Sequence, residues 1–248
     1  MKTIYGISFS DRDISLLPNV PAVQILELSG ELATAPDFAL PEHLQKKSII
    51  ICNSDERKFF NTIPDASSGV RQDFYRLCEH RCAAAENLQA VYATFAPELE
   101  SAFAVPANPV LRDAFAMCFG FAEKHRTPLA LEVRIPGIAA GATEKFAHFK
   151  HSLLYPLRTM CVLHPHEPGA LEIMEKFAAE LPFDCDMFRI VFDAAAGNYL
   201  SGTLLQRILK FIRPAGAVQP VMIFAPGKNA DPSVYLELNK LILTELHK

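Results

Sequence analysis

The sequence contains no tryptophan, no apolar run of membrane-spanning length and no cluster of basic residues. A transmembrane helix needs about 20 consecutive apolar residues, so we expect no contact with a membrane interior. The 24 Lys and Arg residues are scattered along the chain, the net charge is -4 and the pI is near 6.1. Because nucleic-acid binding depends on concentrated positive charge, these features argue against nucleic acid as a partner.

Secretion and disulfide signals are also missing. The N-terminal stretch MKTIYGISFSDRD has neither the apolar segment nor the small-residue cleavage site of a signal peptide. The six cysteines show no repeated CxxC spacing, which argues against a zinc knuckle and a disulfide framework. Cys78 and Cys82 are one helical turn apart, and we interpret them as reduced packing residues. These features predict a cytoplasmic protein.

What the sequence does contain is a series of short apolar runs. Hydrophobic residues make up 50% of the chain and charged ones 21%, enough for a large core. Eight strand-length runs are hydrophobic on both faces, as buried parallel strands are. They are TIYGISF from residue 3, AVQILELS from 22, SIIICN from 48, LQAVYATF from 88, PLALEVRI from 128, TMCVLHP from 159, FRIVFDA from 188 and VQPVMIF from 218.

Helix-like stretches separate most of these runs. They cover residues 70–87, 108–125, 143–154, 169–181, 201–213 and 234–247, whereas the first two connections hold only short segments. Strand and helix alternating to eight strands predict an α/β fold, a single-domain (β/α)8 TIM barrel over residues 1–248. A doubly wound open sheet is the alternative, although no glycine-rich phosphate fingerprint follows the first strand, where such folds carry it.

Barrel geometry indicates where function should lie, because active sites form at the C-terminal ends of the strands. The polar residues that end the apolar runs are therefore the candidates. They include Glu27, Glu132, Arg134, His164, His166, Glu167, Asp193 and, just past the last strand, Lys228. A buried carboxylate needs a partner, because desolvating a charge costs several kcal/mol. A divalent metal or a cationic group would meet that need.

Each candidate also has a structural interpretation. His164 and His166 would share one face of an extended strand and form a ligand pair, or belong to a solvated loop. Asp193 precedes AAAGNYLSG and could cap a turn. Lys228 could bind an anion beside a helix N-terminus, or be an exposed loop lysine. Among the strand-end residues, Glu132 could pair with Arg134 two positions on, and Glu27 with a loop amide.

Three features resemble the xylose isomerase-like TIM barrels, which include sugar phosphate isomerases and epimerases and the type IV endonucleases. The features are LALEVR carrying Glu132, the long loop before the helix that follows the third strand, and FRIVFDAAAGN with Asp193. In that family two glutamates, an aspartate and histidines at strand ends hold a divalent metal. The resemblance implies Glu132, Asp193 and His164 as ligands of a divalent metal such as Mn, Zn or Co.

The ligand set departs from the family pattern at two positions. The residue three after Asp193 is Ala196 rather than histidine, and the last strand, VMIFAPGK, carries no glutamate. The resemblance thus implies a degraded metal-ligand set. Within it we expect Glu132, His164 and His166 as catalytic residues and Glu27, Arg134 and Lys228 as substrate-binding residues.

Two functions from different classes follow. The first is a metal-assisted sugar isomerase or epimerase, in which Glu132 or a histidine moves the proton. The second is a non-catalytic barrel that binds a small polar, carbohydrate-like ligand or a partner protein. A histidine and glutamate pair working without metal is a third interpretation. Schiff-base aldolase chemistry is disfavoured, because no apolar run ends in the lysine that it needs.

Overall fold

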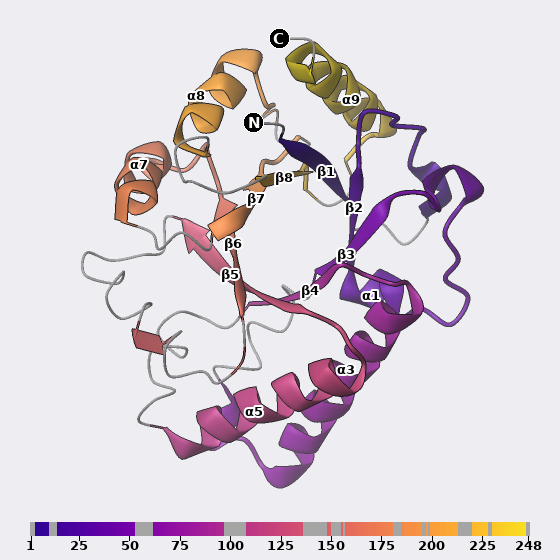
Figure 1. Cartoon of the computed structure of the whole chain (residues 1–248), viewed down its shortest axis with the longest axis vertical. Coiled ribbons are helices and arrows are strands. Elements are labelled where there is room, and N and C mark those ends of the chain that lie inside the picture. The colour runs from indigo at the N-terminus through magenta and orange to yellow at the C-terminus, as the bar shows by residue number, and fades with distance from the viewer. Residues whose placement is uncertain are drawn as a thin grey trace.

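The chain folds into a closed barrel of parallel strands. The computed structural model describes residues 3–9, 14–52, 62–96, 108–135, 148–149, 155, 157–180, 185–194, 197, 199–212, 220–227 and 230–246. Eight strands follow one another around the barrel in chain order, and the first pairs in parallel with the last. Figure 1 shows the ring of strands with the helices outside it. The predicted (β/α)8 barrel is confirmed.

Each of the eight apolar runs overlaps one strand. The strands are β1 Ile4–Phe9, β2 Ile25–Ser29, β3 Ser48–Cys52, β4 Tyr92–Phe95, β5 Leu129–Ile135, β6 Arg158–Leu163, β7 Cys185–Val191 and β8 Val221–Ala225. The start of β7 lies three residues before the predicted run. The sequence before the run, CDM, contains a charged residue and does not continue the apolar pattern.

The main helices also match the helix-like stretches. They are α3 Ser68–Asn87, α5 Pro109–Lys124, α7 Ala170–Glu180, α8 Gly202–Ile212 and α9 Pro232–Leu246. In the short early connections the structure describes α1 Gly30–Ala33 and the 3-10 turns η1 Ile14–Leu16 and η2 Glu42–Leu44, and a further turn, η4 Ile63–Asp65, precedes α3. The stretch 143–154 lies almost wholly outside the described residues.

Local capping chemistry fixes where two of the helices start. The Ser67 side chain accepts a hydrogen bond from the backbone N–H of Val70 at the start of α3. At α5, Asn108 accepts from two backbone N–H groups, and Pro109 occupies the first turn. Both are favoured arrangements, because they satisfy N–H groups that have no partner within the helix.

Residues on the two faces of the strands enter two separate apolar layers. Outward-facing side chains such as Ile7, Leu26 and Ile51 join the large core beneath the helices. Inward-facing side chains form a smaller cluster that fills the lower end of the barrel: Ile25, Ile50, Ala130, Met160, Met187 and Ile223. Because this layer closes the N-terminal end of the barrel, polar chemistry is confined to the middle and the C-terminal mouth.

The fit of this lower layer depends on Gly6 in β1. A Cβ atom at Gly6 would lie 3.0 Å from both Cβ and the carbonyl oxygen of Ile25, and 3.3 Å from Cγ1 of Ile223. Gly6→Ala is therefore expected to lower the free energy of unfolding by about 1–3 kcal/mol, the usual cost of overpacking. Urea denaturation would measure the change.

Gly120 in α5 provides the matched control. A Cβ atom there would meet no other atom within 4 Å, and alanine is the better helix former. Gly120→Ala should raise the free energy of unfolding by about 0.5–1 kcal/mol. Equal effects of the two substitutions would show that the Gly6 contacts do not limit the packing of the barrel.

The cysteines lie mostly in the core. Cys52, Cys78, Cys82, Cys118 and Cys161 are thiols, and all but Cys52 are buried. The sulfur atoms of Cys78 on α3 and Cys118 on α5 are 3.7 Å apart, so this pair contributes to the contact between the two helices.

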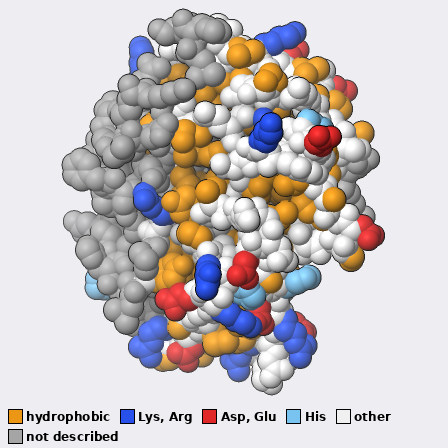
Figure 2. Space-filling view, turned by 45° about the vertical axis from the view of Figure 1, so that its right-hand side comes forward, with side chains coloured by type: hydrophobic (Ala, Val, Ile, Leu, Met, Phe, Trp, Pro, Cys, Tyr) orange, Lys and Arg blue, Asp and Glu red, His pale blue; other side chains and the backbone are white. Residues whose placement is uncertain are grey.

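The outer surface of α3 and α5 carries charges of both signs. Lys124 pairs with Glu79, His125 with Glu86 at 2.9 Å, and Arg76 with Asp73 at 3.2 Å. Figure 2 shows basic and acidic side chains side by side at the lower end of the molecule, where these helices lie in Figure 1.

In the described part of the chain, no helix is long and apolar enough to cross a membrane.

Candidate functional site at the barrel mouth

An arginine lies at the centre of the barrel, above the apolar layer. The guanidinium of Arg189, on β7, donates two hydrogen bonds to Oε2 of Glu27 on β2, from Nε at 2.9 Å and from Nη2 at 2.6 Å. Its Nη1 lies 2.8 Å from Oε1 of Glu132 on β5. The side chains of Glu27, Glu132 and Arg189 are 0%, 1% and 5% exposed. We call these three residues the central bridge.

Two further groups complete the surroundings of Glu132. The hydroxyl of Thr94 on β4 donates to Oε1 of Glu132 at 2.5 Å, and the thiol of Cys52 on β3 lies 3.7 Å from the same oxygen. All these side chains come from inward-facing positions on strands that are not all adjacent. Closure of the barrel is therefore what assembles them.

The charge of Arg189 is secured by its neighbours. Burial alone would lower the pKa of the guanidinium, but Cys52, Glu132 and Glu27 raise it, and the pKa lies well above the ordinary value. Arg189 is therefore the positively charged member of the central bridge. The cationic partner expected for the strand-end carboxylates is this side chain.

A hollow of about 450 Å³ opens at the C-terminal end of β6, β7 and β8. It is lined by His164, His166, Glu167, Val191, Phe192, Asp193 and Gly227. Gly227 has a φ of 91°, and a Cβ atom there would approach the Phe192 carbonyl oxygen at 3.4 Å. A glycine is thus needed for the turn after β8 to pass close to Asp193.

Two ionisable side chains that line the hollow, His164 and Glu167, form a chain with Arg134 beside it. Nη2 of Arg134 donates to Oε1 of Glu167 at 2.6 Å, and Nδ1 of His164 lies 3.7 Å from the same oxygen. The side chains of Arg134, Glu167 and His164 are 42%, 37% and 25% exposed, so they are accessible to a ligand. Arg134 fixes Glu167, and Glu167 in turn lies beside the imidazole.

The structure separates the predicted site residues into two levels. His164, His166 and Asp193 lie together around the hollow, with Arg134 attached to its wall through Glu167. The carboxylates of Glu27 and Glu132 lie deeper, in the central bridge; Glu27 pairs with Arg189 rather than with a loop amide, and Arg134 with Glu167 rather than with Glu132. Lys228 lies outside the described residues.

The donor atoms at the centre do not suit a divalent metal. Oε1 of Glu132 already faces three donors, from Arg189, Thr94 and Cys52. A metal ion bound by this oxygen at about 2.0–2.2 Å would lie against a guanidinium of like charge. Across the described residues, no three His, Cys, Asp or Glu side chains gather closely enough to hold a metal ion. The predicted set of Glu132, Asp193 and His164 is not brought together.

Arg189 was not among the candidates predicted from the sequence, and Glu167, although it was one of the polar residues that follow a strand, was assigned no role. The available signal for Arg189 was its place in the middle of the run MFRIVF, since a charged residue inside a buried strand must have a partner. For Glu167 the signal was its position three residues after His164 at the end of a strand. Neither signal names the partner, which lies on a distant strand.

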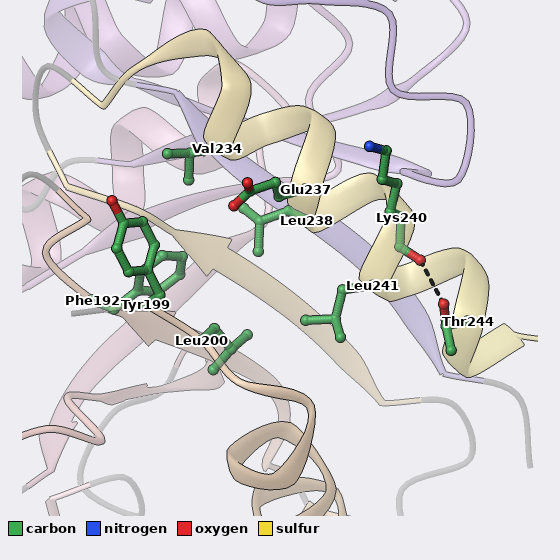
Figure 3. Close-up of a pocket in the computed structure, with 9 residues that line it drawn as sticks. All are labelled: Phe192, Tyr199, Leu200, Val234, Glu237, Leu238, Lys240, Leu241 and Thr244. Carbon is green, nitrogen blue, oxygen red and sulfur yellow. Dashed lines mark hydrogen bonds between the residues drawn. The ribbon is translucent and has the colours of Figure 1, made fainter. Parts of the chain in front are cut away.

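A second hollow lies in the helix layer, between the loop after β7 and α9 (Figure 3). It measures about 310 Å³ and is lined by Phe192, Tyr199, Leu200, Val234, Glu237, Leu238, Lys240, Leu241 and Thr244. The Thr244 hydroxyl is bonded to the Lys240 carbonyl oxygen within α9 at 3.0 Å. Most of the polar side chains that line this second hollow belong to α9. The hollow is separate from the central bridge.

The fold and the polar mouth define a (β/α)8 barrel of the kind that carries its chemistry at the C-terminal ends of the strands. No protein-family model and no curated protein matches the sequence. Solved structures do match the fold over nearly the whole chain.

Three of these structures share the architecture at low sequence identity. An apo 3-keto-D-glucoside 4-epimerase, YcjR, from E. coli has a TM-score of 0.58 and 10% identity, covering 98% of this chain and 100% of its own. D-psicose 3-epimerase with D-tagatose from Clostridium cellulolyticum has a TM-score of 0.62 and 9% identity, covering 99% of both chains. Endonuclease IV from Thermus thermophilus has a TM-score of 0.56 and 11% identity, covering 98% of this chain and 99% of its own. The chain therefore shares the (β/α)8 barrel fold of these three proteins.

Proposed function

We propose that the protein binds a small carbohydrate in the mouth hollow and isomerises or epimerises it by moving a proton with His164 and Glu167. The observation that carries the proposal is the chain of Arg134, Glu167 and His164 along the wall of a hollow of about 450 Å³. Pockets of about 300–1,000 Å³ are typical of small-molecule sites. Similarity to two sugar epimerases at the level of the fold supports the choice of ligand.

The chemistry requires a group that removes a proton from a carbon beside a carbonyl and returns it. An imidazole exchanges protons near neutral pH, and a carboxylate beside it orients the ring and stabilises its charged form. In this proposal Arg134 holds Glu167, Glu167 orients His164, and His166 and Asp193 bind sugar hydroxyls. Glu132 and Glu27 act indirectly, by holding Arg189 beneath the ligand.

The proposed ligand is an uncharged sugar rather than a sugar phosphate. At the described positions of the mouth, Glu167 and Asp193 outnumber Arg134, and in the central bridge two carboxylates outnumber Arg189. An anionic group would be repelled from a hollow with this balance. Phosphorylated sugars would bind more tightly than neutral ones only if Lys228 supplied the missing charge.

Solvent-deuterium exchange tests the reaction. Aldoses and ketoses, each with its phosphorylated form, would be incubated with the protein in D₂O, and deuterium on carbon followed by NMR. His164→Ala should slow the exchange about 10²–10⁴-fold, the usual contribution of a general acid or base, and Glu167→Gln should slow it less. Glu237→Gln, the same change in the second hollow, should leave it unaltered.

The second candidate is a barrel that binds the sugar without converting it. The observation in its favour is that Glu27 and Glu132 are both paired with Arg189 and almost completely buried, which keeps them from the ligand. In that case calorimetry would detect a sugar whose binding is weakened by His166→Ala, and no bound sugar would take up deuterium. If no sugar binds, both functions are excluded.

A further inference from the structure

The central bridge contains two acidic groups and one cation. Glu27, Glu132 and Arg189 are almost completely buried, at 0%, 1% and 5% side-chain exposure. Buried charges are stable only when they are paired, because the loss of hydration costs several kcal/mol for each ion. The guanidinium pairs with both carboxylates through three of its nitrogen atoms, and its single positive charge leaves the central bridge with one excess negative charge.

The geometry of the guanidinium suits this task. Its planar shape reaches Glu27 through Nε and Nη2 and, on the other side, Glu132 through Nη1. A single arginine on β7 thereby links β2 and β5 across the barrel. A metal ion bridging the same oxygens would have to displace these nitrogens, since two cations cannot share one pair of carboxylates at such distances.

We infer that Arg189 is the permanent cation of this barrel and stands in place of a divalent metal between the strand-two and strand-five carboxylates. The inference is independent of the proposed reaction, because it concerns the charge balance of the folded protein. Because this cation is a side chain and not a bound metal ion, chelators should not affect the stability of the folded state. Without the guanidinium, the facing carboxylate oxygens of Glu27 and Glu132 would be left without their cation.

The inference is tested by removing the guanidinium and supplying a metal. Arg189→Met keeps an apolar stem of similar length and leaves two buried carboxylates uncompensated. Its thermal midpoint should fall by about 10 °C, as expected for a broken buried ion pair in a chain of this size. MnCl₂ at about 100-fold over its Kd should then raise the midpoint of this variant by about 5 °C or more.

Two controls separate charge compensation from packing. The wild-type protein should show no shift with MnCl₂ and no shift with EDTA. The triple variant R189M/E27Q/E132Q carries none of the three charges of the central bridge, so it should fold and ignore MnCl₂. If Arg189→Met alone fails to fold, the triple variant decides: folding supports the inference, and failure to fold overturns it by showing that Arg189 acts through packing.

Two further results would overturn the inference. One is near-stoichiometric manganese in the wild-type protein, measured by elemental analysis and lost in Glu132→Gln, which would show that a metal displaces the guanidinium. The other is an Arg189→Met variant as stable as the wild type, or one that MnCl₂ does not stabilise. Sugar binding and deuterium exchange enter neither readout, so failure of the proposed function would leave this result intact.

Discussion

Replacing Glu27 and Glu132 together with glutamine is expected to lower the free energy of unfolding by about 3–5 kcal/mol, the cost of leaving a buried charge without a partner. The double variant strands Arg189, which is 5% exposed, between two amides. Each single variant still offers the guanidinium one carboxylate. A single substitution should therefore cost only about 1–2 kcal/mol, the value of a hydrogen bond to a charged group.

The informative quantity is the departure from additivity. The central bridge contains two acids and one cation. Replacing one acid removes the excess negative charge, and only replacing the second acid leaves Arg189 as an unpaired positive charge. A double-mutant cycle by urea denaturation should give a coupling energy of at least about 1 kcal/mol. Two single costs that add up to that of the double variant would mean that charge balance does not govern the stability of the central bridge.

Phe115→Ala is expected to cost about 3–5 kcal/mol, the range for truncating a buried aromatic residue. Phe115 lies on α5 and is 1% exposed. Its ring contacts those of Phe95, Phe119 and Phe149, at centroid distances of 5.5, 6.1 and 5.6 Å. Removing the ring would leave a cavity between Phe95 on β4, Phe119 on α5 and Phe149. The close-packed rings around it cannot easily move in to fill the space.

Met117, on the same helix, provides the control for this prediction. Its side chain is 42% exposed, so Met117→Ala should change the free energy of unfolding by no more than about 0.5 kcal/mol. Chemical denaturation of both variants would measure the difference. A Phe115→Ala cost close to that of Met117→Ala would show that the aromatic cluster relaxes to fill the space.

The architecture was predictable because it depends on local pattern. Strands such as β3, with isoleucines at 49–51, are apolar on both faces, and helices such as α5 have a clear cap in Asn108 and Pro109. Such signals can be read from a few adjacent residues. Eight strands alternating with helices then leave few arrangements other than closure.

The site was only partly predictable, since its contacts join residues far apart in the sequence. The positions of Glu27 and Glu132 in apolar runs predicted that each carboxylate needs a partner, but the partner of Glu27 is 162 residues away. Arg189 lies within a run that reads as an apolar strand, and no local pattern points from it to β2 or β5. A divalent metal and a cationic group therefore remained alternatives, because the acids were visible and their arginine partner was not.

The link that Arg189 makes across the barrel also bears on folding kinetics. The three residues of the central bridge lie on β2, β5 and β7, and they meet only when the sheet has closed on itself. Contacts that form so late are largely absent from the transition state for folding and have low φ-values. The central bridge should accordingly act on the lifetime of the native state: weakening it speeds unfolding and leaves the folding rate nearly unchanged.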